Sequence, residues 1–196
     1  MIAAANGKAL WYATRGSGAV TLILLSMSFV LGVVTLVGWS TKRLSMLVLQ
    51  LLHRNVSLLV LVFLTIHVAT TVIDGYAPIH WIDAIIPFNS PYRTLWLGLG
   101  TVATDVLLAV VVTSLLRVRI GAKVWRAIHY SSYTIWPLSA LHGLRTGSDT
   151  HRAWMLWIDG LTLLLVAAAL VWRLRSRRPA WLQSILAREP VSGQAR

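Results

Sequence analysis

The stretch that decides the fold runs from His53 to His67 and reads His-Arg-Asn-Val-Ser-Leu-Leu-Val-Leu-Val-Phe-Leu-Thr-Ile-His. Two imidazoles bracket an almost wholly apolar run, which the core of a soluble protein would not build. A second stretch, from His129 to His142, repeats the design with a spacing of 13 residues against 14. Two parallel helices built from these stretches would each offer one imidazole at each of two depths. The pattern therefore predicts two pairs of facing histidines and two metal centres.

The composition places the chain in a membrane. Of its 196 residues 57% are hydrophobic and only 12% are charged, which lies far outside the range of soluble domains. The net charge of +12 would suggest a nucleic-acid partner in a soluble chain. Here the basic residues cluster at the ends of apolar runs, so we expect contact with membrane lipid and no nucleic acid. The absence of cysteine from the sequence excludes disulfides, Fe–S clusters and a thiolate haem ligand.

Five apolar runs predict the helices of an all-α, integral membrane bundle. The runs cover about residues 18–39, 46–73, 94–116, 124–142 and 154–173, and a span needs about 20 residues. We therefore expect about five transmembrane helices. In this organisation residues 1–17 form an external N-terminal segment, residues 18–173 form the transmembrane domain, and residues 174–196 form a basic cytoplasmic tail.

Lysine and arginine fall unevenly on the two sides of these runs. Thirteen of the 18 lie on one side, and the opposite side holds Lys8, Arg15, Arg93, Arg145 and Arg152. The positive-inside rule then puts the N-terminus outside and the C-terminus in the cytoplasm of a multi-pass protein of the cell membrane. His53 and His129 would lie near the inner surface, and His67 and His142 nearer the outer one.

Helix geometry supports the matched depths better than the matched faces. At about 1.5 Å rise per residue, the histidines of each helix lie about 20 Å apart. At about 100° per residue, 14 steps return within about 40° of the starting face, whereas 13 steps miss it by about 140°. Pro137 lies between His129 and His142, and a proline bend would re-aim one imidazole in part.

Haem is the metal centre that such pairs favour. A single histidine in a membrane helix often only hydrogen-bonds a neighbouring helix, but four at matched depths point to ligands. Zinc would more often recruit closely spaced residues or carboxylates, whereas two imidazoles from separate helices suit the axial positions of haem iron. Because no cysteine is available for covalent attachment, we predict two b-type haems, one held by His53 and His129 and one by His67 and His142.

Haem propionates are anionic and need basic partners at the membrane edges. Arg54 and Arg126 lie beside the inner histidines, and Arg145 follows His142 closely. We take these three arginines as propionate candidates, with anchoring of the helix ends at the lipid headgroups as an equally good explanation. Arg93, which starts a predicted helix on the outer side, suits either role.

Two carboxylates fall in or near the predicted spans, Asp105 and Asp159, where an unpaired ionised group is costly. Asp105 either pairs with Arg15 or Arg93, takes part in proton uptake at a quinone site, or stays protonated and hydrogen-bonded. Structural pairing is the interpretation that we favour.

The longest outer loop, residues 74–92, holds an apolar stretch bounded by prolines, which predicts a short interfacial helix and a lid over the outer centre. Its His80, together with Asp74 and Asp83, either attracts a ferric complex or is simply solvated. His151, in another outer loop, poses the same choice. Solvation is the commoner fate of exposed loop histidines.

The pattern resembles the ferric reductase-like transmembrane domain shared by ferric reductases, NADPH oxidases and the haem-bearing membrane subunit of the periplasmic methionine sulfoxide reductase system. The resemblance covers about residues 10–174. Besides the histidines, it rests on sequence similar to a bacterial branch of that family at residues 51–55 (Leu-Leu-His-Arg-Asn), 90–93 (Ser-Pro-Tyr-Arg), 136–137 (Trp-Pro), 141–143 (Leu-His-Gly) and 146–150 (Thr-Gly-Ser-Asp-Thr). The resemblance implies that His53 and His129 ligate the inner haem and that His67 and His142 ligate the outer one.

Together these features predict a diheme b-type cytochrome that moves electrons from a cytoplasmic donor to an outer acceptor such as ferric iron. No FAD- or NADPH-binding domain is expected in the chain, so a cytosolic flavin reductase or a quinol would be the donor. As an enzyme it would be the membrane component of a ferric reductase-like oxidoreductase. Two alternatives stay open: a quinol-linked haem subunit that feeds an external oxidoreductase, and a non-redox transporter or scaffold whose histidines line a polar cavity.

Overall fold

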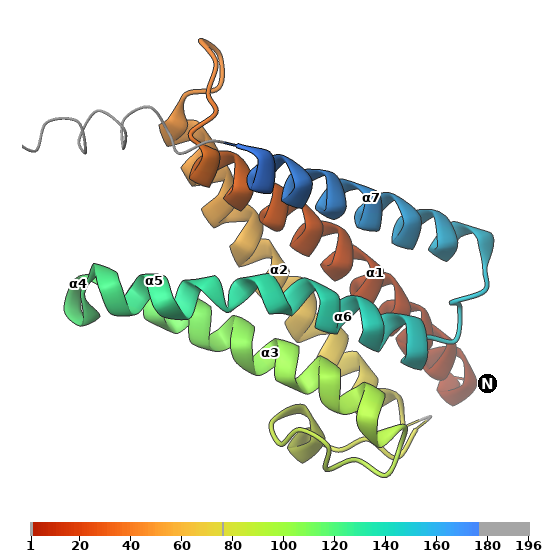
Figure 1. The fold of residues 1–196 in the computed structure, drawn as a ribbon. Helices are drawn as coiled ribbons and strands as arrows, with labels where there is room; N and C mark the ends of the chain where they lie inside the picture. The colour runs from red at the N-terminus through yellow and green to blue at the C-terminus, as the bar shows by residue number, and fades with distance from the viewer. Residues whose placement is uncertain (1, 76, 177–196) are drawn as a thin grey trace, which may run out of the picture.

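A computed structural model describes residues 2–75 and 77–176 (Figure 1). In this part of the chain the regular structure is helical, with no strand, and the predicted all-α class is confirmed. Most of the expected basic tail, from residue 177 on, lies outside the described residues.

Four helices are long and apolar enough to cross a bilayer: α1 (Ile2–Val37), α2 (Met46–Asp74), α3 (Thr94–Leu115) and α7 (Ala153–Arg175). The chain is therefore a multi-pass membrane protein. The remaining predicted span forms two shorter consecutive helices, α5 (Ala122–Tyr130) and α6 (Ser132–Thr146), so the total of five spans stays a prediction. Two short elements, η1 (Trp81–Ala84) and α4 (Arg117–Ile120), lie in the connections.

The first helix begins earlier than the sequence suggested. We expected the span to start near Gly18, but α1 begins at Ile2 and its apolar, membrane-crossing part begins at Ala9. The polar residues before Gly18 include no proline, so nothing in them stops the helix from extending toward the N-terminus.

The long helices pack as two pairs with a cover. α1 lies against α2, α3 lies against α6, and α7 runs along α1 (Figure 1). Apolar side chains from α1, α2, α3, α6 and α7 meet in one core, which includes Val60, Leu107 and Trp136. The indole N–H of Trp136 donates to the Ser26 hydroxyl at 2.7 Å, so the core joins α6 to α1 without leaving this buried donor unpaired.

The helix ends in this bundle follow ordinary capping chemistry. Ser45 precedes α2, and its hydroxyl accepts the N–H of Val48. Gly75 ends the same helix with φ +64°, a left-handed conformation that glycine adopts without steric cost. These caps fix the length of the helix that carries His53 and His67.

The helix opposite α2 is interrupted at Ser131. There the backbone N–H of Ser131 donates to the carbonyl of Ile128 at 3.0 Å, a bond that spans three residues rather than four. Pro137 lies inside α6, which continues past it. The interruption between His129 and His142 therefore comes before the proline that we expected to redirect the chain.

Candidate functional site

The structure brings the four histidines of the two long stretches together as two pairs. The ring centroids of His53 and His129 lie 6.4 Å apart, and those of His67 and His142 lie the same 6.4 Å apart. The ring planes meet at 76° and 88° respectively. Each pair joins α2 to the segment formed by α5 and α6, so the expected pairing at two levels is present.

Three of the four imidazoles are held by backbone carbonyls. Nδ1 of His53 lies 3.0 Å from the Ser28 oxygen, and Nδ1 of His67 lies 2.8 Å from the Thr14 oxygen, both on α1. Nδ1 of His142 lies 2.9 Å from the Trp96 oxygen on α3. A carbonyl can only accept, so each of these Nδ1 atoms carries the proton and each Nε2 is left with a free lone pair. That tautomer is the one that binds a metal through Nε2.

Glycines make room for these rings. A Cβ built on Gly18 would lie 2.9 Å from Nδ1 of His67, and one on Gly100 would lie 2.6 Å from Nδ1 of His142. A Cβ on Gly32 would lie 3.3 Å from Cε1 of His53. Any side chain at the first two positions would collide with the ring, and the third position is tight.

His129 is held differently. Its Nδ1 is buried and has no hydrogen-bond partner among the described residues. The indole of Trp125, one turn earlier on α5, stacks on the imidazole with 5.0 Å between ring centroids. The Trp125 N–H donates to the hydroxyl of Ser114 on α3 at 3.1 Å.

A cavity of about 290 Å³ surrounds the His67–His142 pair. Its walls come from α1, α2, α3, α6, the start of α7 and the loops between them, and include Gly18 and Gly100. Arg15 and Asp149 also line it and form an ion pair with each other. The surface of the lining is largely apolar, and Arg15 and Asp149 are among its polar residues.

The pairs fit haem iron. Two metal–imidazole bonds of about 2 Å each place the ring centroids about 6 Å apart, close to the observed separation. No group of three or more histidines, cysteines or carboxylates is placed to hold a metal within residues 2–75 and 77–176. A site with two protein ligands suits a metal whose other ligands come from a porphyrin.

Comparison with known proteins agrees with this geometry. The family model described as the ferric reductase like transmembrane component matches residues 17–140. The chain belongs to the ferric reductase-like transmembrane family. No curated protein and no solved structure matches the chain.

The ferric reductase-like family is in general one of haem-binding membrane redox domains, and the match places this chain among membrane redox components. The match contains His53, His67 and His129 and ends just before His142. The structure shows that His142 belongs to the same site, because its ring faces that of His67 and its Nδ1 bonds a carbonyl of α3, as those of His53 and His67 bond carbonyls of α1.

The predicted propionate arginines of this ferric reductase-like domain are exposed. Arg54, Arg126 and Arg145 all lie on the surface, and none of them lines the cavity. The guanidinium of Arg145 lies 5.0 Å from the ring centroid of Trp96, and Arg93 donates to the Arg145 carbonyl. Their role toward propionates stays a prediction. Arg15, which the sequence did not single out for this role, is the arginine that lines the cavity.

The expected pairing of Asp105 is wrong. Arg15 pairs with Asp149 instead, and Arg93 bonds a backbone carbonyl. Within the described part of the chain, Asp105 has neither an ion pair nor a side-chain hydrogen bond. Asp159 on α7 has one buried carboxylate oxygen with no partner among the same residues.

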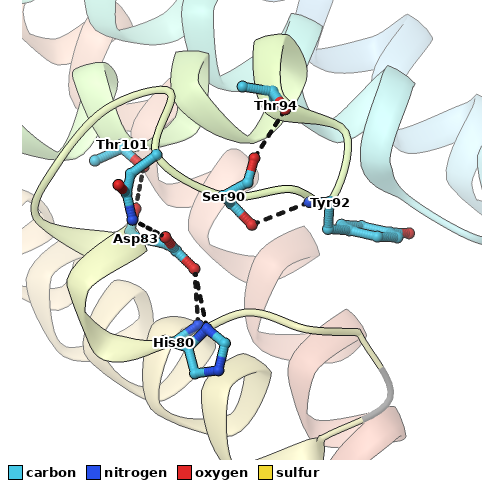
Figure 2. Close-up of polar contacts among 7 residues, drawn as sticks. His80, Asp83, Ser90, Tyr92, Thr94 and Thr101 are labelled. Carbon is cyan, nitrogen blue, oxygen red and sulfur yellow. Dashed lines mark hydrogen bonds and ion pairs between the residues drawn. The ribbon is translucent and has the colours of Figure 1, made fainter.

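The loop that follows α2 is tied to α3 rather than open for metal capture (Figure 2). The Asp83 carboxylate accepts the backbone N–H of His80 at 2.9 Å and the side-chain amide of Asn89 at 2.6 Å. The hydroxyl of Thr101 on α3 donates to the Asp83 carbonyl at 2.8 Å. Asp83 is therefore committed to holding the loop, which contains the 3₁₀ turn η1 where the sequence predicted a short helix.

These contacts change the electrostatics of the loop. The backbone N–H of His80, supported by the Asn89 amide, holds the pKa of the Asp83 carboxyl below its usual range. The His80 ring itself is largely exposed and lies 3.7 Å from the carboxylate. His151 is exposed as well.

Proposed function

We propose that this chain is a diheme b-type cytochrome that carries single electrons across the membrane, from a donor on the cytoplasmic side to an acceptor on the outer side. The observation that supports it best is the repeated geometry of the two histidine pairs. Both pairs have the same ring separation, and in three of the four rings Nδ1 binds a backbone carbonyl, which leaves Nε2 free for a metal. A transporter or scaffold has no need for two such equal pairs.

In this proposal the chain's residues hold and insulate the redox groups. One-electron chemistry is what haem iron supplies when bound, while the protein sets its ligands and surroundings. His53 and His129 hold one centre, and His67 and His142 hold the other. Carbonyls of α1 and α3 fix three of these rings in the ligating tautomer. Arg15, paired with Asp149, places a cation in the wall of the cavity around His67 and His142, where it would serve as a partner for an anionic propionate.

The direction of transfer rests on the positive-inside orientation. With the C-terminus in the cytoplasm, the His53–His129 pair receives electrons and the His67–His142 pair delivers them. A cytosolic flavin reductase or a membrane quinol is the donor. The acceptor is an outer-side oxidant such as a ferric complex, or an external oxidoreductase that a quinol-linked subunit would feed.

Haem content tests the central proposal. We expect the purified protein, expressed with ample haem supply, to contain two non-covalent haems per chain by pyridine haemochrome and protein assays, with a six-coordinate, low-spin spectrum. A ratio near zero would overturn the proposal in favour of a scaffold or transporter. A ratio near one would mean that one histidine pair is structural.

Single-ligand variants test the order of the two centres. His53→Ala should lose the first centre and keep the second, because the rings lie on separate turns with separate backbone partners. His67→Ala should do the reverse and should block reduction of a ferric chelate outside proteoliposomes that hold reductant inside. If His67→Ala protein lacks the His67–His142 centre but still reduces the external chelate at the wild-type rate, the proposal that the two centres act in series is wrong. Supplying flavin reductase or quinol as the only reductant distinguishes the donors.

A further inference from the structure

We propose that Ser114 and Trp125 act as positioning residues that raise the reduction potential of the His53–His129 centre, because they keep His129 from donating to a backbone carbonyl as the other three histidines do. This inference rests on the proposed function, because it concerns a haem held by that pair.

The other three sites follow one rule. Each Nδ1 bonds a backbone carbonyl, and the residue four positions after that carbonyl is a glycine: Thr14 and Gly18, Ser28 and Gly32, Trp96 and Gly100. In a helix a side chain leans back toward the preceding turn, so the residue at i+4 lies beside the carbonyl of residue i. Only a glycine there leaves the carbonyl open to an imidazole from a neighbouring helix.

The fourth position breaks the rule. On α1 the two glycines are 14 residues apart, and 14 residues after Gly100 on α3 stands Ser114. Its hydroxyl donates to the Val110 carbonyl at 2.6 Å. That carbonyl is the one which the rule would assign to His129, and a second hydroxyl, that of Thr113, also donates to it at 3.2 Å. The acceptor is occupied from within its own helix.

Trp125 holds the His129 ring in the place of the missing hydrogen bond. Its indole covers one face of the His129 ring, and its N–H is anchored on the Ser114 hydroxyl. The imidazole is therefore fixed by stacking instead of by a hydrogen bond to Nδ1, and that nitrogen has no partner among the described residues. Ser114 thus blocks the carbonyl and also holds the group that replaces it.

The electronic consequence has a definite sign. An Nδ1–H that donates to a carbonyl makes its imidazole more basic, and a more basic axial ligand stabilises the ferric state more than the ferrous state. His129 lacks this donation. The His53–His129 centre therefore has one such ligand where the His67–His142 centre has two, and Ser114 moves its potential upward.

The test is a redox titration of the full-length protein, with haem absorbance and low-spin EPR read for each centre. Ser114→Gly opens the Val110 carbonyl to His129 and should shift the reduction equilibrium of that centre about tenfold toward the oxidised form, a downward shift of 59 mV for one electron. Ser114→Ala is the matched control: it removes the hydroxyl but keeps the Cβ beside the carbonyl, and should leave the potential near that of wild type. The His67–His142 centre should not move in either variant.

Two results would overturn the inference: an unchanged potential in Ser114→Gly, or equal shifts in Ser114→Gly and Ser114→Ala. Gly32→Ala provides a second test at the same centre in case Ser114→Gly does not accumulate. Its Cβ would press on His53 and weaken the bond to Ser28, so the potential should rise; no rise would also count against the inference. Haem content separates the two proposals, because wild-type protein without haem at this pair overturns the proposed function itself.

Discussion

Three of the four histidines share one arrangement, in which Nδ1 donates to a backbone carbonyl and a glycine four residues later leaves room for the ring. Leaving a buried imidazole N–H unpaired costs about 1–3 kcal/mol, so each Nδ1 bond contributes to stability as well as to ligand orientation. The glycine is as necessary as the carbonyl, because a Cβ at Gly18 or Gly100 would occupy the space of the ring. Substitution of the glycine should therefore act on haem binding although no glycine atom touches the metal.

Gly18→Ala should displace the His67 ring and weaken haem binding at the His67–His142 pair by about 10-fold to 100-fold, the usual cost of losing a partner of a metal ligand. Gly16→Ala is the matched control, because a Cβ at Gly16 meets no atom within 4 Å. Haem content after graded haem supply measures the effect. Equal haem retention in the two variants would contradict the close fit of Gly18 and His67.

Single residues also show what could be predicted from the sequence. The histidines and their pairing were predicted, because imidazoles are rare in apolar helices and their spacing can be counted. The role of the glycines was not, since it depends on which face of α1 meets α2. A signal did exist: Gly18 and Gly32 repeat the 14-residue spacing of His53 and His67. The pairing of Arg15 with Asp149 joins α1 to the loop before α7, far apart in the sequence, and no local pattern encodes it.

At the scale of elements, the interruption at Ser131 reduces the angle between the directions of His129 and His142 that their 13-residue spacing would create in a regular helix. A turn closed over three residues advances about 120° per residue instead of about 100°, which recovers part of the missing rotation. The sequence pointed to Pro137 for this purpose, but the three-residue bond lies at Ser131, before the proline.

Insertion of one alanine between Ser131 and Ser132 should separate the two centres. The extra residue rotates α6 by about 100° relative to α5, so His129 and His142 can no longer both face α2. We expect haem content to fall from two per chain to one. An alanine inserted after Lys42, in the exposed connection between α1 and α2, is the control and should leave two. Two haems in both insertions would show that the helix interruption does not set the register.

The loop between α2 and α3 is an element whose stability should depend on pH. The pKa of Asp83 is lowered in the folded protein by the N–H of His80, so its contribution is full above the unfolded pKa and is lost as the pH falls through the folded pKa. Hydrogen exchange of residues 77–93, corrected for intrinsic rates, should therefore rise in acid. Asp83→Asn should show this faster exchange already at neutral pH, and Asp74→Asn serves as the control. If the hydrogen exchange of this loop in the wild-type protein does not change in acid, Asp83 does not stabilise the loop as described.

At the scale of the whole molecule, composition and hydropathy predicted most of the architecture. A chain this apolar must satisfy its backbone within helices when it lies in lipid, so the all-α class followed directly. The boundaries were less accurate, because α1 extends through polar residues that carry no stop signal. The apolar run opposite α2 appears as two helices, since a window of hydropathy does not detect a change of hydrogen-bond spacing at one residue.

Orientation is the property on which the direction of electron transfer depends, and it can be tested on the whole molecule. Nine of the 14 lysines and arginines in the described part of the chain lie toward the end of the bundle that holds the α1–α2 connection, α4 and the end of α7. Basic residues resist translocation, so a tag after Arg196 should be cytoplasmic and a tag before Lys8 external. Protease accessibility of both tags in sealed right-side-out and inverted vesicles measures this. Because His53 and His67 lie at opposite depths on α2, the reverse result would make His67 and His142 the cytoplasmic pair and would reverse the proposed path of electrons.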